Sequence, residues 1–108
     1  MASLLELIGN TPMVELKKLN PNPNVKIFIK LEGNNPGGSV KDRAALNMIG
    51  AALERGDIKP GDKMVEATSG NTGIALAMIA RFYNLELELV LPDSSTRERT
   101  LTMEAFGA

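Results

Sequence analysis

Residues 34–43, which read NNPGGSVKDR, form a glycine-rich turn that runs directly into a predicted helix. Gly37 and Gly38 can adopt positive φ angles, which lets backbone N–H groups converge on an anion. Ser39 is suited to cap the helix, and Asp42, three residues later, completes the spacing of a capping box. The stretch therefore predicts the start of a helix and, beside it, a place that suits an anion.

Lys41 stands at the head of this predicted helix, where the helix macrodipole disfavours a protonated amine by about 0.3–1 kcal/mol. A neutral lysine is the nucleophile that forms imines with carbonyl compounds, so Lys41 is a candidate catalytic residue. The alternative interpretation is a solvated lysine after a loop. The stretch is not a phosphate-binding Walker A motif, because Lys41 is followed by Asp42 instead of serine or threonine.

A second motif, residues 68–73 (TSGNTG), follows a predicted strand at residues 63–67 and begins a second predicted helix. Its hydroxyl and amide groups are neutral donors, its glycines allow close backbone approach, and a helix N-terminus favours negative charge. This combination suits a carboxylate or a phosphate group. Taken alone, the hexapeptide also fits an ordinary helix N-cap beside a tight turn.

The pattern around the two motifs predicts an α/β fold with a parallel sheet and crossover helices. Strands are predicted at residues 25–32, 63–67 and 85–91, and helices at residues 41–55, 74–83 and 95–106, with Arg97 and Arg99 on the exposed side of the last helix. Ligands of such sheets bind at the carboxyl ends of the strands. If the strands that precede the two motifs are neighbours, the motifs form one site.

Composition removes several function classes. The 108 residues include no cysteine and no histidine, which excludes disulfides, thiolate chemistry, Ser-His-Asp triads and most zinc sites, and no metal is expected. The net charge of −1 gives no reason to expect nucleic acid as a partner. No signal peptide is recognised, and no apolar run approaches the ~20 residues of a membrane span. We expect a small cytoplasmic domain or part of a larger protein.

Three stretches together resemble the cysteine synthases, also called O-acetylserine sulfhydrylases. They are residues 8–12 (IGNTP), 35–43 (NPGGSVKDR) and 66–77 (EATSGNTGIALA), and they are most similar to those of the B isozymes. These are pyridoxal-phosphate enzymes of fold type II, a group that also holds cystathionine β-synthase and the serine and threonine dehydratases. Members are much longer than this chain, so the resemblance implies an N-terminal fragment that lacks the loop for the cofactor phosphate.

The resemblance implies a role for each motif residue. Lys41 would form an imine with pyridoxal 5′-phosphate and then act as acid and base, and Asn71 would bind the 3′-oxygen of the cofactor ring. The residues implied to bind the substrate are Thr68, Ser69, Gly70, Asn71 and Thr72. The implied reaction makes L-cysteine from O-acetylserine and sulfide or thiosulfate by β-replacement. The full-length enzyme is expected to be a homodimer, and the isolated chain is expected to be inactive.

The resemblance also divides the chain. Residues 1–40 are expected to pack partly with a large domain absent from this sequence, and residues 41–108 to form an incomplete small α/β domain. Two alternatives stay open. One is another reaction on the same scaffold, of the cystathionine β-synthase or serine dehydratase type. The other is a non-enzymatic module that binds a small anion or a protein through the two motifs.

Overall fold

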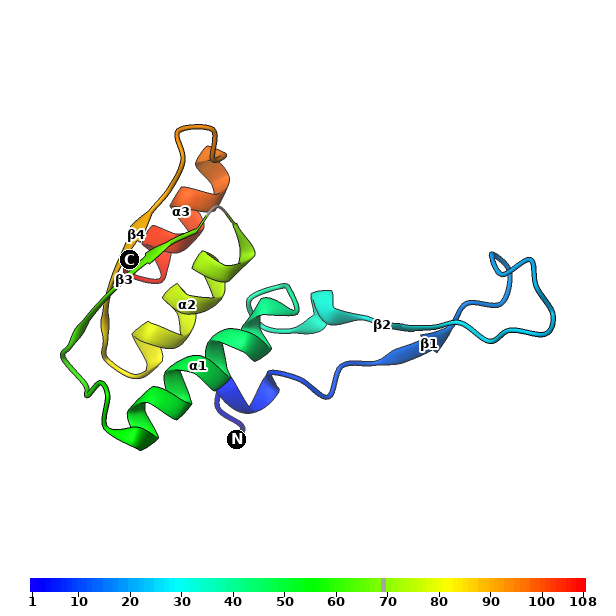
Figure 1. The fold of residues 1–108 in the computed structure, drawn as a ribbon, viewed down its shortest axis with the longest axis horizontal. Coiled ribbons are helices and arrows are strands. Elements are labelled where there is room, and N and C mark those ends of the chain that lie inside the picture. The colour runs from blue at the N-terminus through cyan, green and yellow to red at the C-terminus, as the bar shows by residue number, and fades with distance from the viewer. Residues whose placement is uncertain (69) are drawn as a thin grey trace.

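The computed structural model describes residues 1–68 and 70–108, and Figure 1 shows their arrangement. The elements in chain order are η1 (Leu5–Leu7), β1 (Met13–Glu15), β2 (Phe28–Lys30), η2 (Glu32–Asn34), α1 (Lys41–Arg55), β3 (Lys63–Ala67), α2 (Asn71–Phe82), β4 (Glu86–Val90) and α3 (Arg97–Ala105). Strands β3 and β4 are parallel, with Lys63 opposite Glu86 and Ala67 opposite Val90. Helix α2 is the crossover between them, so the predicted α/β class is confirmed.

The first predicted strand does not join this sheet. Its middle residues form β2, which pairs antiparallel with β1, Met13 lying opposite Lys30. The prediction that this strand belongs to the parallel sheet is therefore wrong, and the condition that it neighbours β3 is not met. Alternating apolar residues predict a strand but not its partner. Here β1, which residues 16–27 connect to β2, supplies the hydrogen bonds of an antiparallel hairpin, including Leu16 N–H to Ile27 O at 2.8 Å.

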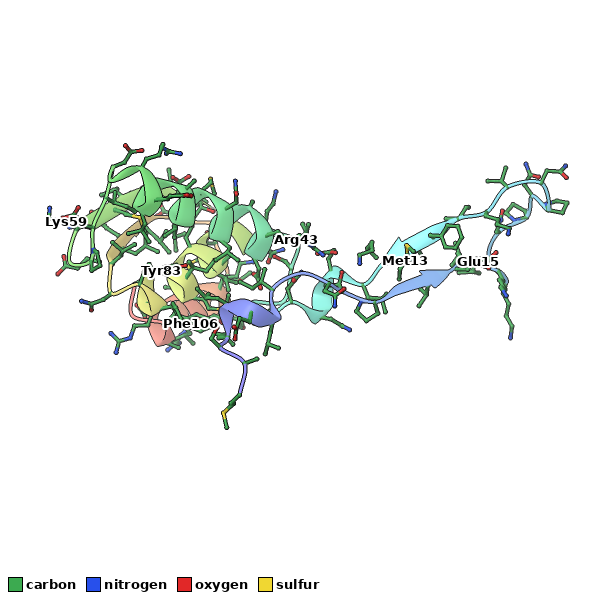
Figure 2. All side chains as sticks on the ribbon, turned by 90° about the horizontal axis from the view of Figure 1, so that it is seen from below. Met13, Glu15, Arg43, Lys59, Tyr83 and Phe106 are labelled. Carbon is green, nitrogen blue, oxygen red and sulfur yellow. The ribbon has the colours of Figure 1, made fainter. Side chains whose placement is uncertain are left out.

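The β1–β2 ribbon extends away from the helices and accounts for the long axis of a molecule measuring 54 × 34 × 25 Å (Figure 1). Figure 2 shows that side chains crowd together in the helical part, whereas those of Met13 and Glu15 lie on the isolated ribbon. Met13 is 62 % exposed, and Val14, Phe28 and Ile29 are exposed as well. The ribbon therefore presents apolar side chains that no described part of the chain covers.

The core surrounds α2, which packs against α1, β4 and α3. Burial on several sides explains why its sequence is apolar almost all round: Gly73, Ala75, Leu76, Ala77, Met78, Ile79 and Ala80 are all buried. Burying a side chain such as that of Ile79 contributes about 1.5–3 kcal/mol. Helix α1 adds Ala45 and Ile49 to this core, and η1 adds Leu5. None of the helices in the described part of the chain is long and apolar enough to cross a bilayer.

Helix α1 has the bounds that its pattern predicts, and Gly56 ends it in a left-handed conformation with φ +79°. Its start differs from the predicted capping box. Val40 is the N-cap residue, and the Ser39 hydroxyl accepts a hydrogen bond from the Lys41 N–H at 3.2 Å. Because the helix begins one residue later than a Ser39 cap requires, the carboxylate of Asp42 folds back to the turn instead of closing the box.

Candidate active site

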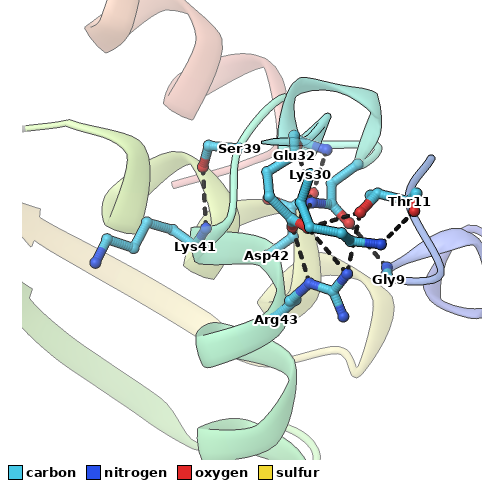
Figure 3. Close-up of polar contacts among 10 residues, drawn as sticks. Gly9, Thr11, Lys30, Glu32, Ser39, Lys41, Asp42 and Arg43 are labelled. Atoms are coloured by element: carbon cyan, nitrogen blue, oxygen red, sulfur yellow. Dashed lines mark hydrogen bonds and ion pairs between the residues drawn. The ribbon is translucent and has the colours of Figure 1, made fainter. Parts of the chain in front are cut away.

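Lys41 is the first residue of α1, and its side chain is exposed. Figure 3 shows its amine extending away from a polar network that lies on the other flank of the glycine turn. The backbone N–H of Lys41 is held by the Ser39 hydroxyl. The side chain is accessible to a carbonyl compound, while the backbone that carries it is anchored.

Asp42 stabilises the glycine turn by accepting a hydrogen bond from it. Its side chain is fully buried, and Oδ2 accepts a hydrogen bond from the Gly37 N–H at 2.5 Å. Oδ1 is buried and has no hydrogen-bond partner among the described residues. Burial raises the pKa of Asp42, and the bond from Gly37 opposes that shift. Gly38, at φ +88°, completes the turn by donating to the Asn35 carbonyl at 2.8 Å.

The network on the other flank centres on the Glu32 carboxylate (Figure 3). Oε2 accepts bonds from Arg43 Nε and Asn35 Nδ2, both at 2.8 Å, and Oε1 accepts bonds from Thr11 Oγ1 at 2.6 Å and Arg43 Nη2 at 3.0 Å. The Arg43 guanidinium, with the Thr11 and Asn35 donors, lowers the pKa of Glu32 to about 2. Asn35 in turn accepts a bond from the Gly9 N–H at 2.8 Å. Three separate segments of the chain therefore meet at one carboxylate.

This network was not predicted as a unit. The motifs at residues 8–12 and 35–43 indicate a family resemblance and a glycine turn, and the sequence predicts no role for Glu32. The available signal is glycine: a Cβ on Gly9 would lie 2.9 Å from Arg43 Nη1. Gly9 is therefore the residue of this segment that indicates where the Arg43 guanidinium lies close to the backbone.

The second motif spans the end of β3 and the start of α2. The Thr68 N–H donates to the Val90 carbonyl at 3.1 Å, which extends the pairing with β4. Gly70 is the N-cap residue, Asn71 is the exposed first residue of the helix, and Thr72 is half-buried. The predicted substrate residue Ser69 lies outside the described residues.

The two motifs are brought together by helices and not by neighbouring strands. Lys41 begins α1 and Asn71 begins α2, and these helices pack against each other. They run in the same general direction, so that both start toward the same end of the pair (Figure 1). The two helix N-termini therefore lie toward the same end of the α1–α2 pair, although the condition from which the sequence derives a common site, adjacent strands β2 and β3, is not met.

Helix α3 contributes a residue beside the second motif. Arg99 is exposed, as predicted, but its guanidinium also lies against the backbone of Gly70, where an added Cβ would be 3.4 Å from Nη1. Gly73 is packed more tightly, because a Cβ there would lie only 2.8 Å from Met103 Cε. No local pattern reveals these contacts, since α3 arrives from a distant part of the sequence.

The sequence profile described as that of pyridoxal-phosphate dependent enzymes matches residues 4–108. The chain belongs to the pyridoxal-phosphate-dependent enzyme family. The chain is 57 % identical over 108 residues to cysteine synthase B of Salmonella typhimurium. The alignment covers 100 % of this chain and 36 % of that protein. It is 45 % identical to the O-acetylserine dependent cystathionine β-synthase of Bacillus subtilis, covering 100 % of this chain and 35 % of that one.

Solved structures agree with the sequence comparisons. A hydrogen sulfide-producing enzyme from Fusobacterium nucleatum superimposes with a TM-score of 0.91 at 47 % identity, covering 99 % of this chain and 35 % of that one. The parallel sheet and its helices are therefore those of a fold type II enzyme. The chain spans about a third of the length of the relatives that it matches.

The described residues of this pyridoxal-phosphate enzyme chain fit one part of a cofactor site. Lys41 offers an exposed primary amine on an anchored turn, and Asn71 offers an exposed amide. The start of α2 offers backbone N–H groups and the Thr72 hydroxyl where the helix dipole favours an anion. Among the described residues, no group of three or more acidic side chains could hold a metal ion.

Proposed function

We propose that this chain is the lysine-bearing N-terminal part of a cysteine synthase, an enzyme that makes L-cysteine from O-acetylserine and sulfide or thiosulfate by β-replacement. One observation carries the proposal: an exposed lysine and an exposed asparagine begin two packed helices in a chain that is 57 % identical, over its whole length, to a cysteine synthase B. As the resemblance implies, we also propose that the complete protein is a cytoplasmic homodimer.

Pyridoxal phosphate, when bound, supplies the electron sink that makes the α-proton of an amino acid acidic. Lys41 would hold the cofactor covalently through Nζ and, once released by the substrate, would take up and return the proton with the same amine. Asn71 would donate from Nδ2 to the ring oxygen of the cofactor. The hydroxyl and backbone N–H groups of Thr68, Ser69, Gly70, Asn71 and Thr72 would hold the carboxylate of the substrate.

The rest of the protein completes the site in this proposal. Residues 1–40 would pack partly with a large domain that follows this chain in its relatives, and residues 41–108 would form an incomplete small domain. The exposed apolar side chains of the β1–β2 ribbon support this division, as does the concentration of the core around α2. The isolated chain is then a half-site without turnover of its own.

A second reaction on the same scaffold is favoured by one observation, the 45 % identity to an O-acetylserine dependent cystathionine β-synthase. That enzyme type replaces the same leaving group with a different sulfur nucleophile. The two functions are separated by supplying O-acetylserine with sulfide, thiosulfate or homocysteine to the complete protein. Cysteine synthase activity requires that sulfide or thiosulfate be used in preference to homocysteine.

The proposal is tested by visible absorption on adding pyridoxal phosphate, followed by borohydride reduction and peptide mass spectrometry. We expect a cofactor absorption band in the complete protein that Lys41→Ala abolishes, with the reduced cofactor attached to Lys41. Turnover that survives Lys41→Ala would overturn the assignment of the lysine. Turnover of O-acetylserine and sulfide by the isolated 108-residue chain would contradict the half-site.

A further inference from the structure

The glycine turn that carries Lys41 is joined at its two ends by one ion pair. Glu32 precedes the turn, and Arg43 follows it on the first turn of α1. The Arg43 guanidinium donates hydrogen bonds to both oxygens of the Glu32 carboxylate, from Nε to Oε2 at 2.8 Å and from Nη2 to Oε1 at 3.0 Å. Lys41 lies on the segment between these two anchors, and its amine extends away from them (Figure 3).

The turn needs such an external constraint. Its sequence Pro36-Gly37-Gly38 contains two glycines, and glycine loses more conformational freedom on folding than any other residue. The hydrogen bonds within the turn join Gly37 to Asp42 and Gly38 to Asn35. Both partner residues adjoin the ion pair, because Asn35 also donates to Glu32 and Asp42 is the neighbour of Arg43. Loss of the pair would therefore loosen both bonds.

The geometry of the pair distinguishes it from the other ion pair on the same helix. The Glu32 and Arg43 side chains are 21 % and 40 % exposed, and Thr11 and Asn35 occupy the remaining acceptor positions of the carboxylate. Arg55 and Asp57, at the far end of α1, are 62 % and 56 % exposed and have the character of a surface pair. Surface pairs contribute little, whereas a two-point guanidinium–carboxylate pair fixes orientation. The Arg55–Asp57 pair can therefore serve as the control for the Glu32–Arg43 pair.

We infer that Glu32 and Arg43 are positioning residues for Lys41: their two-point ion pair, held by Thr11 and Asn35, closes the glycine turn and sets the direction in which the lysine leaves α1. Neither residue touches the reacting atoms. Their effect on chemistry rests on the proposed function, because it is transmitted through Lys41. Their effect on the turn does not depend on any cofactor.

The first arm of the test measures residue-specific hydrogen exchange by NMR in the 108-residue chain. Glu32→Gln keeps the shape of the side chain but removes its charge, and Arg43→Lys keeps the charge but cannot form two parallel bonds. We expect exchange of the Gly37 and Gly38 amides to rise by roughly 10- to 100-fold in Glu32→Gln, the change in local opening that corresponds to the loss of one hydrogen bond to a charged group, and by less in Arg43→Lys. The amides of α2 should be unchanged, and Asp57→Asn, the matched control, should leave the turn unaffected.

The second arm measures how fast pyridoxal phosphate with borohydride labels Lys41, with the exposed Lys17 of the same chain as an internal reference. We expect the ratio of Lys41 labelling to Lys17 labelling to fall by about tenfold in Glu32→Gln relative to wild type. The ratio should fall by less in Arg43→Lys and stay unchanged in Asp57→Asn. A general loss of structure would instead raise the exchange of α2. If the amides of α2 also exchange faster in Glu32→Gln, that variant has lost its fold. The inference is then tested with Arg43→Lys and Thr11→Val in its place.

The two arms separate this inference from the proposed function. Wild-type exchange at Gly37 and Gly38 in the folded variants would overturn the inference, whatever the cofactor does. Increased exchange with an unchanged labelling ratio would also overturn it, because the pair would then hold the turn without directing the lysine. Labelling of Lys41 no faster than that of Lys17 in the complete wild-type protein would count against the proposed function, and the exchange arm alone would then decide whether the pair closes the turn.

Discussion

The buried carboxylate of Asp42 lies directly against the backbone of Gly37. The Gly37 N–H donates to Oδ2 at 2.5 Å, and a Cβ on Gly37 would collide with Oδ1 and lie 2.9 Å from Cγ. The first glycine of the motif is therefore required by a carboxylate of this chain, independently of any anion. The contact couples the turn to the first turn of α1.

Gly37→Ala is expected to destabilise the protein by about 1–3 kcal/mol, the usual cost of overpacking, because the Asp42 carboxylate must move and give up its bond. The measurement is the free energy of unfolding in urea. Gly50→Ala is the matched control: it lies within α1, and nothing is within 4 Å of its added Cβ. That variant should be more stable than wild type by about 0.4–1 kcal/mol, and equal effects of the two substitutions would contradict the contact.

Asp42→Asn is expected to change how stability depends on pH. Burial raises the pKa of Asp42, so above its ordinary value of 3.8 the folded state holds a proton that the unfolded state has released. Wild-type stability attributable to this group therefore falls as pH rises from 3.8 through the folded pKa. The asparagine cannot titrate, so the free energy of unfolding of Asp42→Asn minus that of wild type should increase over this range. A difference that is flat from pH 4 to pH 8 would refute the assignment, and Asp57→Asn serves as the exposed control.

Glu32→Gln should show the opposite dependence. The pKa of Glu32 is lowered from 4.5 to about 2 by Arg43, Thr11 and Asn35, so its stabilising contribution is fully present above pH 4.5 and is lost as pH falls through about 2. Thermal unfolding followed by circular dichroism should give a constant advantage of wild type over Glu32→Gln from pH 8 to pH 5. That advantage should shrink between pH 4.5 and pH 2, and its persistence at pH 2 would show that the charge of Glu32 is not the source.

Lys41→Ala should leave stability within about 0.5 kcal/mol of wild type, because the side chain is exposed and buries no apolar surface. After reduction with borohydride, the same variant should lose the pyridoxal-phosphate label at position 41, while labelling of the exposed Lys17 stays unchanged. Measuring both on one preparation separates a chemical role from a structural one. A large loss of stability in Lys41→Ala would point to a packing role that the structure does not contain.

Local features of the fold were predictable from the sequence, and tertiary pairings were not. The bounds of α1 follow from apolar spacing and the stop at Gly56, and β4 follows from alternation that passes into a fully apolar run. The partner of β2 does not follow, because alternation is the same in a parallel sheet and in an isolated ribbon. The shift of the α1 cap from Ser39 to Val40 is likewise not predictable from the sequence, because the capping-box spacing does not show that Asp42 accepts its hydrogen bond from Gly37.

The candidate site divides in the same way. Lys41 is a candidate because it heads a helix that follows a glycine turn, which is local information, whereas the role of Asn71 toward the cofactor is implied by the family resemblance. The sequence does not indicate the role of Glu32, because two of the residues that donate hydrogen bonds to its carboxylate lie far along the chain. Thr11 lies 21 positions earlier and Arg43 lies 11 positions later. A charged residue followed by a glycine has no local signature of such a role. Only the assembled structure shows that the carboxylate is saturated with donors.

The β1–β2 ribbon has a consequence for the order in which the protein opens. Its strands make few apolar contacts, and its side chains are exposed, so its hydrogen bonds depend on one another and not on the core around α2. Such a segment behaves as a foldon of low local stability, which unzips and re-forms while the rest stays folded. Glu32 stands at the boundary of that foldon. Fluctuations of the ribbon are therefore expected to reach the lysine turn through the hydrogen-bond network of Glu32, which also includes the bond from Gly9 to Asn35.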